Sequence, residues 1–387
     1  MFIGDSFAAA FAQANPDVFD EVHETGDRPV DIDAQLAACD LVVSVMDSDL
    51  VMRAVAAGRP VAMVDSLFSF WQHDRSLQEI ADLCASAPRG RYAGLAAHFG
   101  KLSPHEQILA AHMLADQSIL QNFPGVTERV REVAALCGTA FHVTGSIIDS
   151  EGLHDAVPAA GDVRHDLVIN LGGFKNFFLD FEENNDYLEL IDVWIRDLLT
   201  DWDHLDSVLV CGGAFRGPRQ KSITVNGRTA RFTCLSQRPF LREVAAASHY
   251  MMTPGLTALH EAIALGRLPM ALPEQHYGHV VNMRMLKGTH FARMGATLAV
   301  PGVDYPLIED DFEGTRCIVA QARRLLDDSR GLGEFRRMMG ESTRSFFDLT
   351  EADRAQGLAE LRRTLDGPPV TSLLRNMSES ISEVSCA

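Results

Sequence analysis

Short, uninterrupted apolar runs alternate with helix-like segments along most of this 387-residue chain. Runs such as Leu41–Met46, Val61–Val64 and Ala140–Val143 are too short for buried helices. Strands that are apolar on both faces are typical of parallel sheets, because crossover helices cover both sides of the sheet. The alternation therefore predicts an α/β fold that is built from βαβ units.

The alternation is interrupted once, between Asp149 and Asp166, where the chain is polar, contains Gly and Pro, and has no period. We interpret residues 151–165 as a linker and residues 1–150 as a first Rossmann-like domain. Its further expected elements are strands at Met1–Gly4 and Ile119–Gln121 and helices at Leu50–Ala57 and Ser76–Ala85.

After the linker the same alternation begins again and predicts a second Rossmann-like domain over residues 166–333. Strands are expected at Asp166–Leu171, Ser207–Cys211, Arg231–Leu235, His249–Thr253, Pro269–Leu272 and Thr297–Val300. Helices are expected at Asn185–Leu199, Pro239–Ala246, Leu256–Leu265, Gly278–Leu286 and Gly314–Leu326. Residues 334–366 are charged and helical, and the Ser-rich residues 367–387 are expected to form a flexible, frayed tail. Two doubly wound halves would face a cleft, where open α/β sheets bind ligands.

The charge balance restricts the partners of the chain. With 34 basic and 53 acidic residues the formal net charge is −19, which argues against binding to nucleic acid or to an anionic membrane. No apolar run is long enough for a membrane span, and the first residues lack a basic flank and a cleavage site. Seven Cys without a C-x-x-C pair favour a reducing compartment. We expect a cytoplasmic protein with small-molecule partners, and a homodimer stays open.

The most informative motif is Thr253-Pro-Gly-Leu-Thr-Ala-Leu-His-Glu261. A strand ends at Thr253, Gly255 permits a close backbone approach, and a helix begins near Leu256 and Thr257. The free N–H groups and the dipole at such a helix start favour an anion, for example a diphosphate. Glu261, one turn further on, can accept hydrogen bonds from ribose hydroxyls. An ordinary amphipathic helix with a solvated Glu is an equally good explanation of this motif on its own.

Two neighbouring segments support the first interpretation. Asn170-Leu-Gly-Gly173 forms a glycine-rich loop after the first strand of the same half, and Glu274-Gln-His-Tyr-Gly-His-Val-Val-Asn282 opens another helix. This ordered set, over about residues 166–299, resembles the nucleotide-sugar-binding half of GT-B glycosyltransferases. The likeness is to the UDP-glycosyltransferases and to the peptidoglycan N-acetylglucosaminyltransferase.

The resemblance implies a GT-B fold and an inverting, metal-independent transfer of a sugar from a UDP-sugar, with no cofactor. It places the diphosphate at Gly172, Gly173, Gly255, Leu256 and Thr257, the ribose at Glu261, and the base near the segment from Ser236 to Phe240. The "P…Q-x-x-N" segment would contact the donor sugar through Gln275, His276, His279 and Asn282.

The match departs from the family pattern before Asn282. UDP-glycosyltransferases usually carry an acidic residue and Gln there, whereas this chain has Gly278-His279. Arg216, Arg284 and Lys287 could contact a donor phosphate or a uronate carboxylate. Solvated surface cations are the commoner role for each of them taken singly.

The first half resembles the acceptor-binding half of these enzymes in Cys39–Met46, Arg59–Asp65 and Leu120–Val126. The chain begins at what resembles the second strand, so the first strand and its glycine-rich acceptor loop are expected to be missing. Three residues follow strand ends that face the cleft and are candidates for the base that removes the acceptor proton, with helix capping as the alternative: Asp47, Asp65 and His73.

A narrower resemblance rests on the FIGDSF start, the NFPGV segment and the missing acidic-Gln pair. These features are similar to those of cytosylglucuronate synthases and related proteins of antibiotic biosynthesis. That family implies transfer of glucuronate from UDP-glucuronate to N1 of cytosine. A UDP-sugar hydrolase and a non-catalytic accessory protein that binds nucleotide sugars stay open as alternatives.

Other patterns point to different chemistry but are less complete. Gly4-Asp-Ser6 resembles the start of GDSL hydrolases, with Asp162–His165 or Asp201–His204 as the matching pair, but no G-x-N-D block accompanies it. Asp47-Ser-Asp49 could bind a metal, and so could His276 with His279, but no third ligand is evident near the His pair. No G-x-G-x-x-G or G-x-x-x-x-G-K-[ST] motif indicates a dinucleotide or P-loop site.

Overall fold

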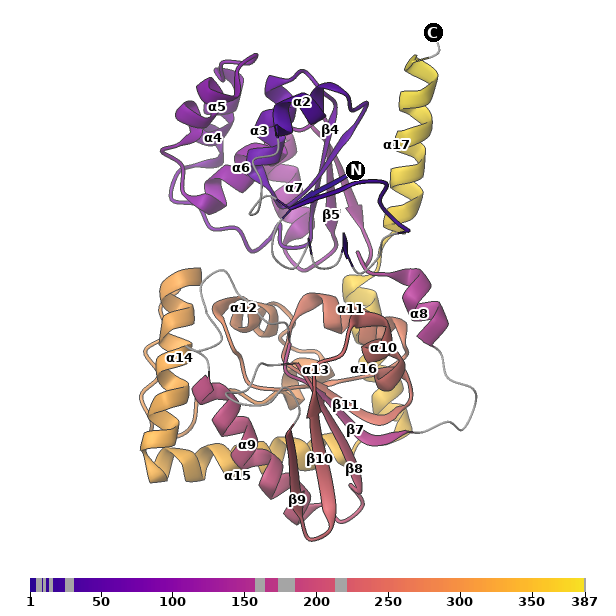
Figure 1. Ribbon diagram of the computed structural model, residues 1–387. Coiled ribbons are helices and arrows are strands. Elements are labelled where there is room, and N and C mark those ends of the chain that lie inside the picture. Colours follow the sequence, from indigo (N-terminus) through magenta and orange to yellow (C-terminus); the bar gives the residue numbers. More distant parts are fainter. Residues whose placement is uncertain are drawn as a thin grey trace.

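The computed structural model describes residues 1–4, 9, 12–13, 17–24, 31–156, 164–172, 185–212 and 221–385. Two α/β halves lie one above the other in Figure 1, the first built on a parallel sheet and the second on a mostly parallel one. The expected fold class is confirmed: two Rossmann-like halves face a cleft and a helical segment ends the chain, which is the arrangement called GT-B.

The first half contains a four-stranded parallel sheet whose strands follow one another in chain order. Strand β4 is buried at all five positions, as expected for a strand that is covered on both faces. The four strands are β3 (Val42–Val45), β4 (Val61–Asp65), β5 (Gln117–Gln121) and β6 (Ala140–Thr144). The helices around them are α2 (Ile32–Ala37), α3 (Ser48–Ala56), α4 (Leu77–Ala85), α5 (Tyr92–Phe99), α6 (Pro104–Leu114) and α7 (Val126–Ala134).

A separate pair of short parallel strands lies at the start of the chain, β1 (Phe2–Gly4) and β2 (Val22–Glu24). The expected strand at Met1–Gly4 is confirmed. Strand β2 was not predicted, because its three residues include His23 and Glu24 and carry no apolar run. The expected absence of a first strand stays a prediction.

The second half has a six-stranded sheet in the order β12-β11-β7-β8-β10-β9, in which β9 alone runs antiparallel to its neighbour. The chain leaves β7 toward β8 and later returns to its other side as β11, so the winding direction reverses next to β7. Ligand crevices form at such switch points. The strands are β7 (His165–Asn170), β8 (Ser207–Cys211), β9 (Lys221–Val225), β10 (Arg228–Thr233), β11 (Ala247–Met252) and β12 (Met270–Ala271).

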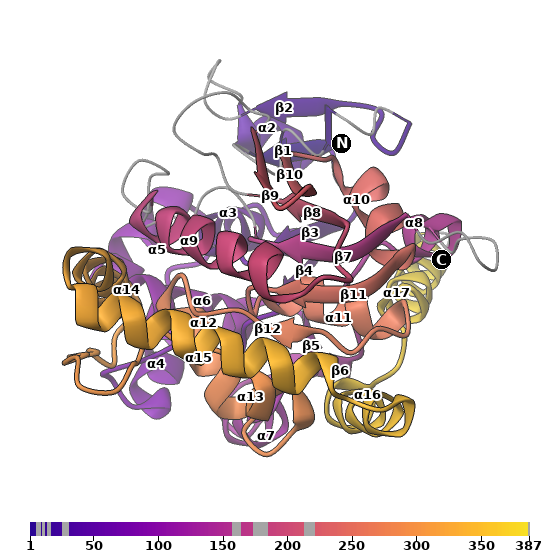
Figure 2. The ribbon, with the colours of Figure 1, turned by 90° about the horizontal axis from the view of Figure 1, so that it is seen from below.

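Helices surround this sheet and continue to the end of the chain. Helices α9 and α15 pack against each other, and in the view from below of Figure 2 they lie in front, on the side that faces away from the first half. The helices are α9 (Asn185–Asp201), α10 (Gln237–Ala245), α11 (Leu256–Ala264), α12 (Tyr277–Met285), α13 (His290–Met294), α14 (Asp311–Asp327), α15 (Ser329–Phe347), α16 (Glu351–Leu365) and α17 (Val370–Ser385).

The C-terminal segment returns from the second half to the first. Helix α16 packs against α11 and α13, whereas α17 lies beside the first half (Figure 1). At the crossing, Asn122 Nδ2 donates to the carbonyl of Asp366 over 2.7 Å, and the Gly145 N–H donates to the carbonyl of Pro368 over 2.9 Å. These bonds tie the end of the chain to the strand ends of β5 and β6.

Three expected segments differ from the structure. The first part of the linker forms α8 (Ser150–Ala156), because Leu153 and Ala156 share one helix face and pack on α10. Residues 297–300 form no strand, since the N–H of Leu298 donates to the carboxylate of Glu274 instead of to a neighbouring strand. Most of the tail that was expected to fray is helix α17. In its sequence Leu374, Met377, Ile381 and Val384 recur at helical spacing.

The crossing gives a test of how the two halves are held together. A Cβ on Gly145 would lie 2.7 Å from the carbonyl oxygen of Gly367, too close for any side chain. We expect Gly145→Ala to displace the crossing and lower the free energy of unfolding by about 1–3 kcal/mol. Limited proteolysis should then release α17 faster. Gly138→Ala is the matched control because a Cβ there meets nothing within 4 Å, and equal behaviour of the two variants would contradict the prediction.

Candidate functional site

A cavity of about 1620 Å³ lies between the two halves and takes its lining from both. The first half contributes the segments after β3 and β4 and the start of α6. The second half contributes the segments after β7, β8 and β11 and the starts of α11, α12 and α14. The cavity therefore lies at the carboxyl ends of the strands, where the switch point predicts a ligand.

Glycines allow three strand ends of the second half to approach each other closely. Gly172 has φ +80°, and a Cβ on it would lie 2.8 Å from Thr253 Oγ1. Gly212 has φ +86°, and a Cβ there would meet the backbone of Gly172. Both positions thus exclude other residues on conformational and steric grounds. Gly212 was not among the predicted site residues, although the Gly-Gly pair that follows β8 is its signal in the sequence.

The turn after β11 leads into the start of α11 without a side-chain cap. Asn282 Nδ2 donates to the carbonyl of Pro254 over 2.8 Å and holds this turn. Gly255 is the N-cap residue and has no side chain that could accept from the first N–H groups of the helix. Gly255, Leu256 and Thr257 all line the cavity, so these N–H groups lie at its wall.

Helices α10 and α12 also begin without a side-chain cap hydrogen bond, at Ser236 and His276. By contrast, Ser76 and Ser103 close capping boxes at α4 and α6. The starts of α10 and α11 therefore keep donors and positive dipole ends available for an anion. At α12 the Tyr277 N–H donates to Thr315 Oγ1 over 3.0 Å, and Asp310 caps the start of α14.

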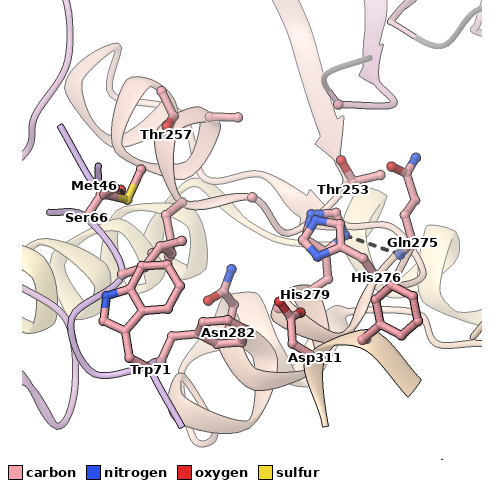
Figure 3. A pocket seen from close by; sticks show the side chains of 18 of the residues that line it. Met46, Ser66, Trp71, Thr253, Thr257, Gln275, His276, His279, Asn282 and Asp311 are labelled. Atoms are coloured by element: carbon pink, nitrogen blue, oxygen red, sulfur yellow. Dashed lines mark hydrogen bonds between the residues drawn. The ribbon is translucent and has the colours of Figure 1, made fainter. Parts of the chain in front are cut away.

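Two histidines lie beside the start of α11. The rings of His276 and His279 lie against each other with their centroids 3.7 Å apart and their planes tilted by 38°, and Figure 3 shows them between Asn282 and Gln275. His279 Nδ1 accepts from the N–H of Gln275 over 3.2 Å. Burial lowers the pKa of His276 to about 4 and the pKa of His279 well below its usual range. Both rings are thus neutral near neutral pH.

Glu261 is buried in the wall of the cavity, with only 5% of its surface exposed. Gln237 Nε2 donates to its carboxylate over 2.5 Å. Burial is the main cause that raises the pKa of Glu261 to about 7. Any further hydrogen-bond donor to this carboxylate would stabilise its charged form and lower its pKa. Ribose hydroxyls would be such donors.

The first half presents an aromatic wall, formed by Phe70, Trp71 and His105. Phe70 also lies 6.5 Å, centroid to centroid, from Tyr277 of the second half. Arg129 fixes the segment before this wall, since it donates to the carbonyls of Phe68 and Trp71 over 3.0 and 2.5 Å. The wall is therefore held in place before any ligand binds.

Asp65 supports this wall from beneath. Its fully buried carboxylate accepts from the Leu67 N–H over 2.5 Å, from Trp71 Nε1 over 2.6 Å, and lies 2.8 Å from His112 Nε2. His112 Nδ1 is in turn 2.7 Å from Ser118 Oγ. Asp65 does not line the cavity, and these contacts occupy its acceptor sites.

The other two base candidates differ in their placement. Asp47 accepts from the Leu50 N–H over 3.1 Å as the N-cap of α3 and does not line the cavity. His73 lines the cavity, and its Nδ1 lies 2.8 Å from the carbonyl of Arg75. That carbonyl requires the proton on Nδ1, which leaves Nε2 as an acceptor with no partner among the described residues.

Sequence reasoning missed one histidine of the cavity. His105, at the start of α6, accepts from the Gln72 N–H through Nδ1 over 3.2 Å. Its Nε2 lies 3.7 Å from Asp311 of the second half. A single His near a helix start gives no signal in the sequence, because only the tertiary fold brings it to Asp311.

The structure brings most of the predicted donor residues together. Those that line the cavity are Gly172, Phe240, Gly255, Leu256, Thr257, Glu261, Gln275, His276, His279 and Asn282. Ser236 is the N-cap of α10 but does not line the cavity. Arg284 does not line it either, because its guanidinium pairs with Glu309 at 2.6 Å. Gly173 and Arg216 lie outside the described residues.

The weaker alternatives gain little from the structure. Ser6 and Asp162 lie outside the described residues, and Asp201 and His204 do not line the cavity. Asp49 is bound to Arg53 at 2.7 Å and to Tyr92. Over the described ranges no three His, Cys, Asp or Glu side chains come close enough to hold a metal ion together. Within the same part of the chain, no helix has the length and apolarity to cross a membrane.

Comparison with known proteins gives distant likenesses only. No family model matches the chain, and no curated protein matches it. Among solved structures, a UGT of Phytolacca americana complexed with UDP-2-fluoro-glucose and pterostilbene is 13% identical, with a TM-score of 0.40, and the match covers 92% of this chain and 80% of the other. A UDP-glucosyltransferase from Polygonum tinctorium is 12% identical, with a TM-score of 0.39, and the match covers 92% of this chain and 89% of the other. The spinosyn forosaminyltransferase is 14% identical, with a TM-score of 0.38, and the match covers 87% of this chain and 79% of the other. TM-scores this low support no conclusion about function. Any functional proposal has to rest on the residues of the cavity.

The buried Asp65 gives a direct test of its structural role. We expect Asp65→Ala to lower the free energy of unfolding by about 3 kcal/mol, because it leaves His112, the Leu67 N–H and the Trp71 indole N–H without their acceptor. Asp47→Ala, which removes only a helix cap, should cost about 1 kcal/mol. Denaturant unfolding of the two variants measures the difference. Equal losses would show that the buried network contributes no more than one exposed cap.

Proposed function

We propose that this protein transfers a sugar from a UDP-sugar to a small acceptor that binds against the first half. The observation that carries the proposal is one cavity in which the uncapped start of α11 lies beside glycine turns and the buried Glu261, opposite an aromatic wall. The helix start suits a diphosphate, Glu261 suits a ribose, and the wall suits an acceptor.

In this proposal each part of the chain has a chemical task. The helix starts and the two His rings stabilise negative charge as the diphosphate leaves. His73, whose Nε2 carries a free lone pair, removes the acceptor proton as the sugar bond forms. Attack from the side opposite the diphosphate inverts the anomeric centre. The charge stabilisation comes from the protein's own groups, so the proposal needs no metal ion.

The finer prediction, glucuronate transferred to cytosine, receives less support from this cavity. Its described lining holds no Lys or Arg, and Arg284 is already paired with Glu309. A uronate carboxylate would also lie near Glu309 and Asp311, which line the cavity. A neutral sugar is therefore the donor that these charges favour, whereas the aromatic wall remains suitable for a pyrimidine.

The test is product analysis with UDP-glucose and UDP-glucuronate, each with and without pyrimidine and phenolic acceptors. A glycoside together with UDP supports the proposal. Free sugar formed without an acceptor would identify a UDP-sugar hydrolase, and UDP binding without turnover would identify an accessory protein.

Glu261 predicts how nucleoside binding depends on pH. The pKa of Glu261 is about 7 in the free protein, and ribose hydroxyls that donate to the carboxylate lower it in the complex. The affinity for uridine should therefore rise with pH up to about 7 and then stay level, with a proton released on binding below that value. Calorimetry from acidic to mildly alkaline pH measures both effects.

Glu261→Gln tests the cause of that dependence. The variant should bind uridine about tenfold more weakly, because hydrogen bonds to a charged acceptor are stronger than those to a neutral one. Its affinity should also no longer change with pH. A variant that keeps the wild-type affinity and pH profile would remove Glu261 from the nucleoside site.

His73 and Asp47 form a matched pair for the assignment of the base. We expect His73→Gln to lower kcat about 10²–10⁴-fold with unchanged UDP affinity, because the variant lacks a group that accepts the acceptor proton. Asp47→Asn should leave kcat near the wild-type value, since its side chain caps α3 outside the cavity lining. The reverse pattern in steady-state kinetics would assign the base to Asp47.

A further inference from the structure

The described lining of the cavity carries an unusual charge for a site that binds a diphosphate. It holds the carboxylates of Asp74, Glu309, Asp310, Asp311 and Glu261 and no Lys or Arg. Two of these are partly neutralised, Glu309 by Arg284 and Asp310 by the start of α14. A diphosphate diester brings two further negative charges. Helix dipoles supply only about half a positive charge each, so a further positive group would complete the site.

His276 is the side chain that can become this group. It is the N-cap of α12, lines the cavity, and receives no hydrogen bond at its ring nitrogens from the described residues. His279 differs, because its Nδ1 is occupied by the Gln275 N–H. A proton on that nitrogen would break the bond, so His279 stays neutral and presents Nε2–H near Gly255.

The groups around His276 keep its ring neutral near neutral pH in the free protein. Burial and the positive end of α12 both disfavour a charged ring. From α14, Asp311 favours the charged ring, and Figure 3 shows its carboxylate close to the His pair. His105 of α6 lies on Asp311, and Glu309 of the preceding segment is held by Arg284 and Tyr277. A diphosphate at the start of α11 would add negative charge and reverse this balance.

We propose that His276 takes up one proton from solvent when the diphosphate of a UDP-sugar enters the cavity, and releases it when UDP leaves. His279 keeps its single proton and donates through Nε2 to the same diphosphate. The bound diphosphate thus faces one imidazolium and one neutral donor in place of a fixed cation. This inference rests on the proposed function and adds to it the charged partner of the leaving group.

The experiment compares uridine with the methyl ester of uridine 5′-diphosphate, whose phosphates stay fully ionised near neutral pH. Calorimetric titrations in buffers of different ionisation enthalpy count the protons exchanged. Uridine should release a fraction of a proton through Glu261, whereas the methyl ester should show an added uptake that approaches one proton. Its affinity relative to uridine should rise as the pH falls, by up to about tenfold per pH unit.

Variants assign the proton. His276→Asn should abolish the added uptake and flatten the relative pH profile, whereas His279→Asn should weaken binding and keep the uptake. His142→Asn is the matched control, because His142 of β6 bonds Gln117 of β5 and does not line the cavity. NMR titration of the His276 ring in the wild-type protein, free and bound, gives the same answer without a substitution.

The outcomes separate this inference from the proposed function. Uridine and methyl ester binding without added uptake, or uptake that persists in His276→Asn, overturns the inference and leaves the nucleotide site in place. If the methyl ester binds no more tightly than uridine, the inference about His276 is also overturned. If neither compound binds, the proposed function fails, and the inference fails with it.

Discussion

The close approach of three strand ends at the switch point of the second sheet is the constraint on which the site depends. Gly172 and Gly212 adopt positive φ there, and any side chain on them would collide with Thr253 or with the neighbouring backbone. Because these strand ends lie so close together, the turn before α11 reaches the floor of the cavity. Asn282 then holds that turn from α12. The position of the uncapped start of α11 is thus a consequence of backbone packing, and few polar side chains are needed to build it.

The cavity combines this rigid floor with groups whose charge responds to the ligand. Burial raises the pKa of Glu261 and lowers that of His276, so near neutral pH Glu261 is only partly ionised and His276 is neutral in the free protein. In the proposed complex each group becomes charged next to the part of the ligand that stabilises the charge. The cavity therefore carries less buried, unpaired charge than two fully ionised groups would bring, and such charge is costly. The opposite wall needs no such response, because Asp65 and Arg129 fix its aromatic residues in advance.

Much of the fold and of the cavity lining in the second half could be predicted from the sequence, because both depend on local patterns. The apolar runs locate most strands within a few residues, and the motif from Thr253 to Glu261 locates the start of α11. Contacts between distant segments leave no such pattern. His105 meets Asp311, and Arg284 is taken up by Glu309, only after the chain has folded. Helix α8 was mistaken for linker because its partner lies on α10, far along the chain.

Asp47 and Asp65 show why a residue type after a strand does not define a role. Asp47 comes two residues after the end of β3, and Asp65 is the last residue of β4 in the same sheet. Both were candidates for the catalytic base. After β3 the chain enters a helix at once, so Asp47 accepts from the helix start. After β4 it forms a longer segment that folds back over the strand end, so Asp65 is enclosed beneath Trp71 and His112. His73 comes at the end of that longer segment and reaches the cavity with a free nitrogen. The length of the connection, rather than the acidity of the side chain, decides which group can meet a substrate.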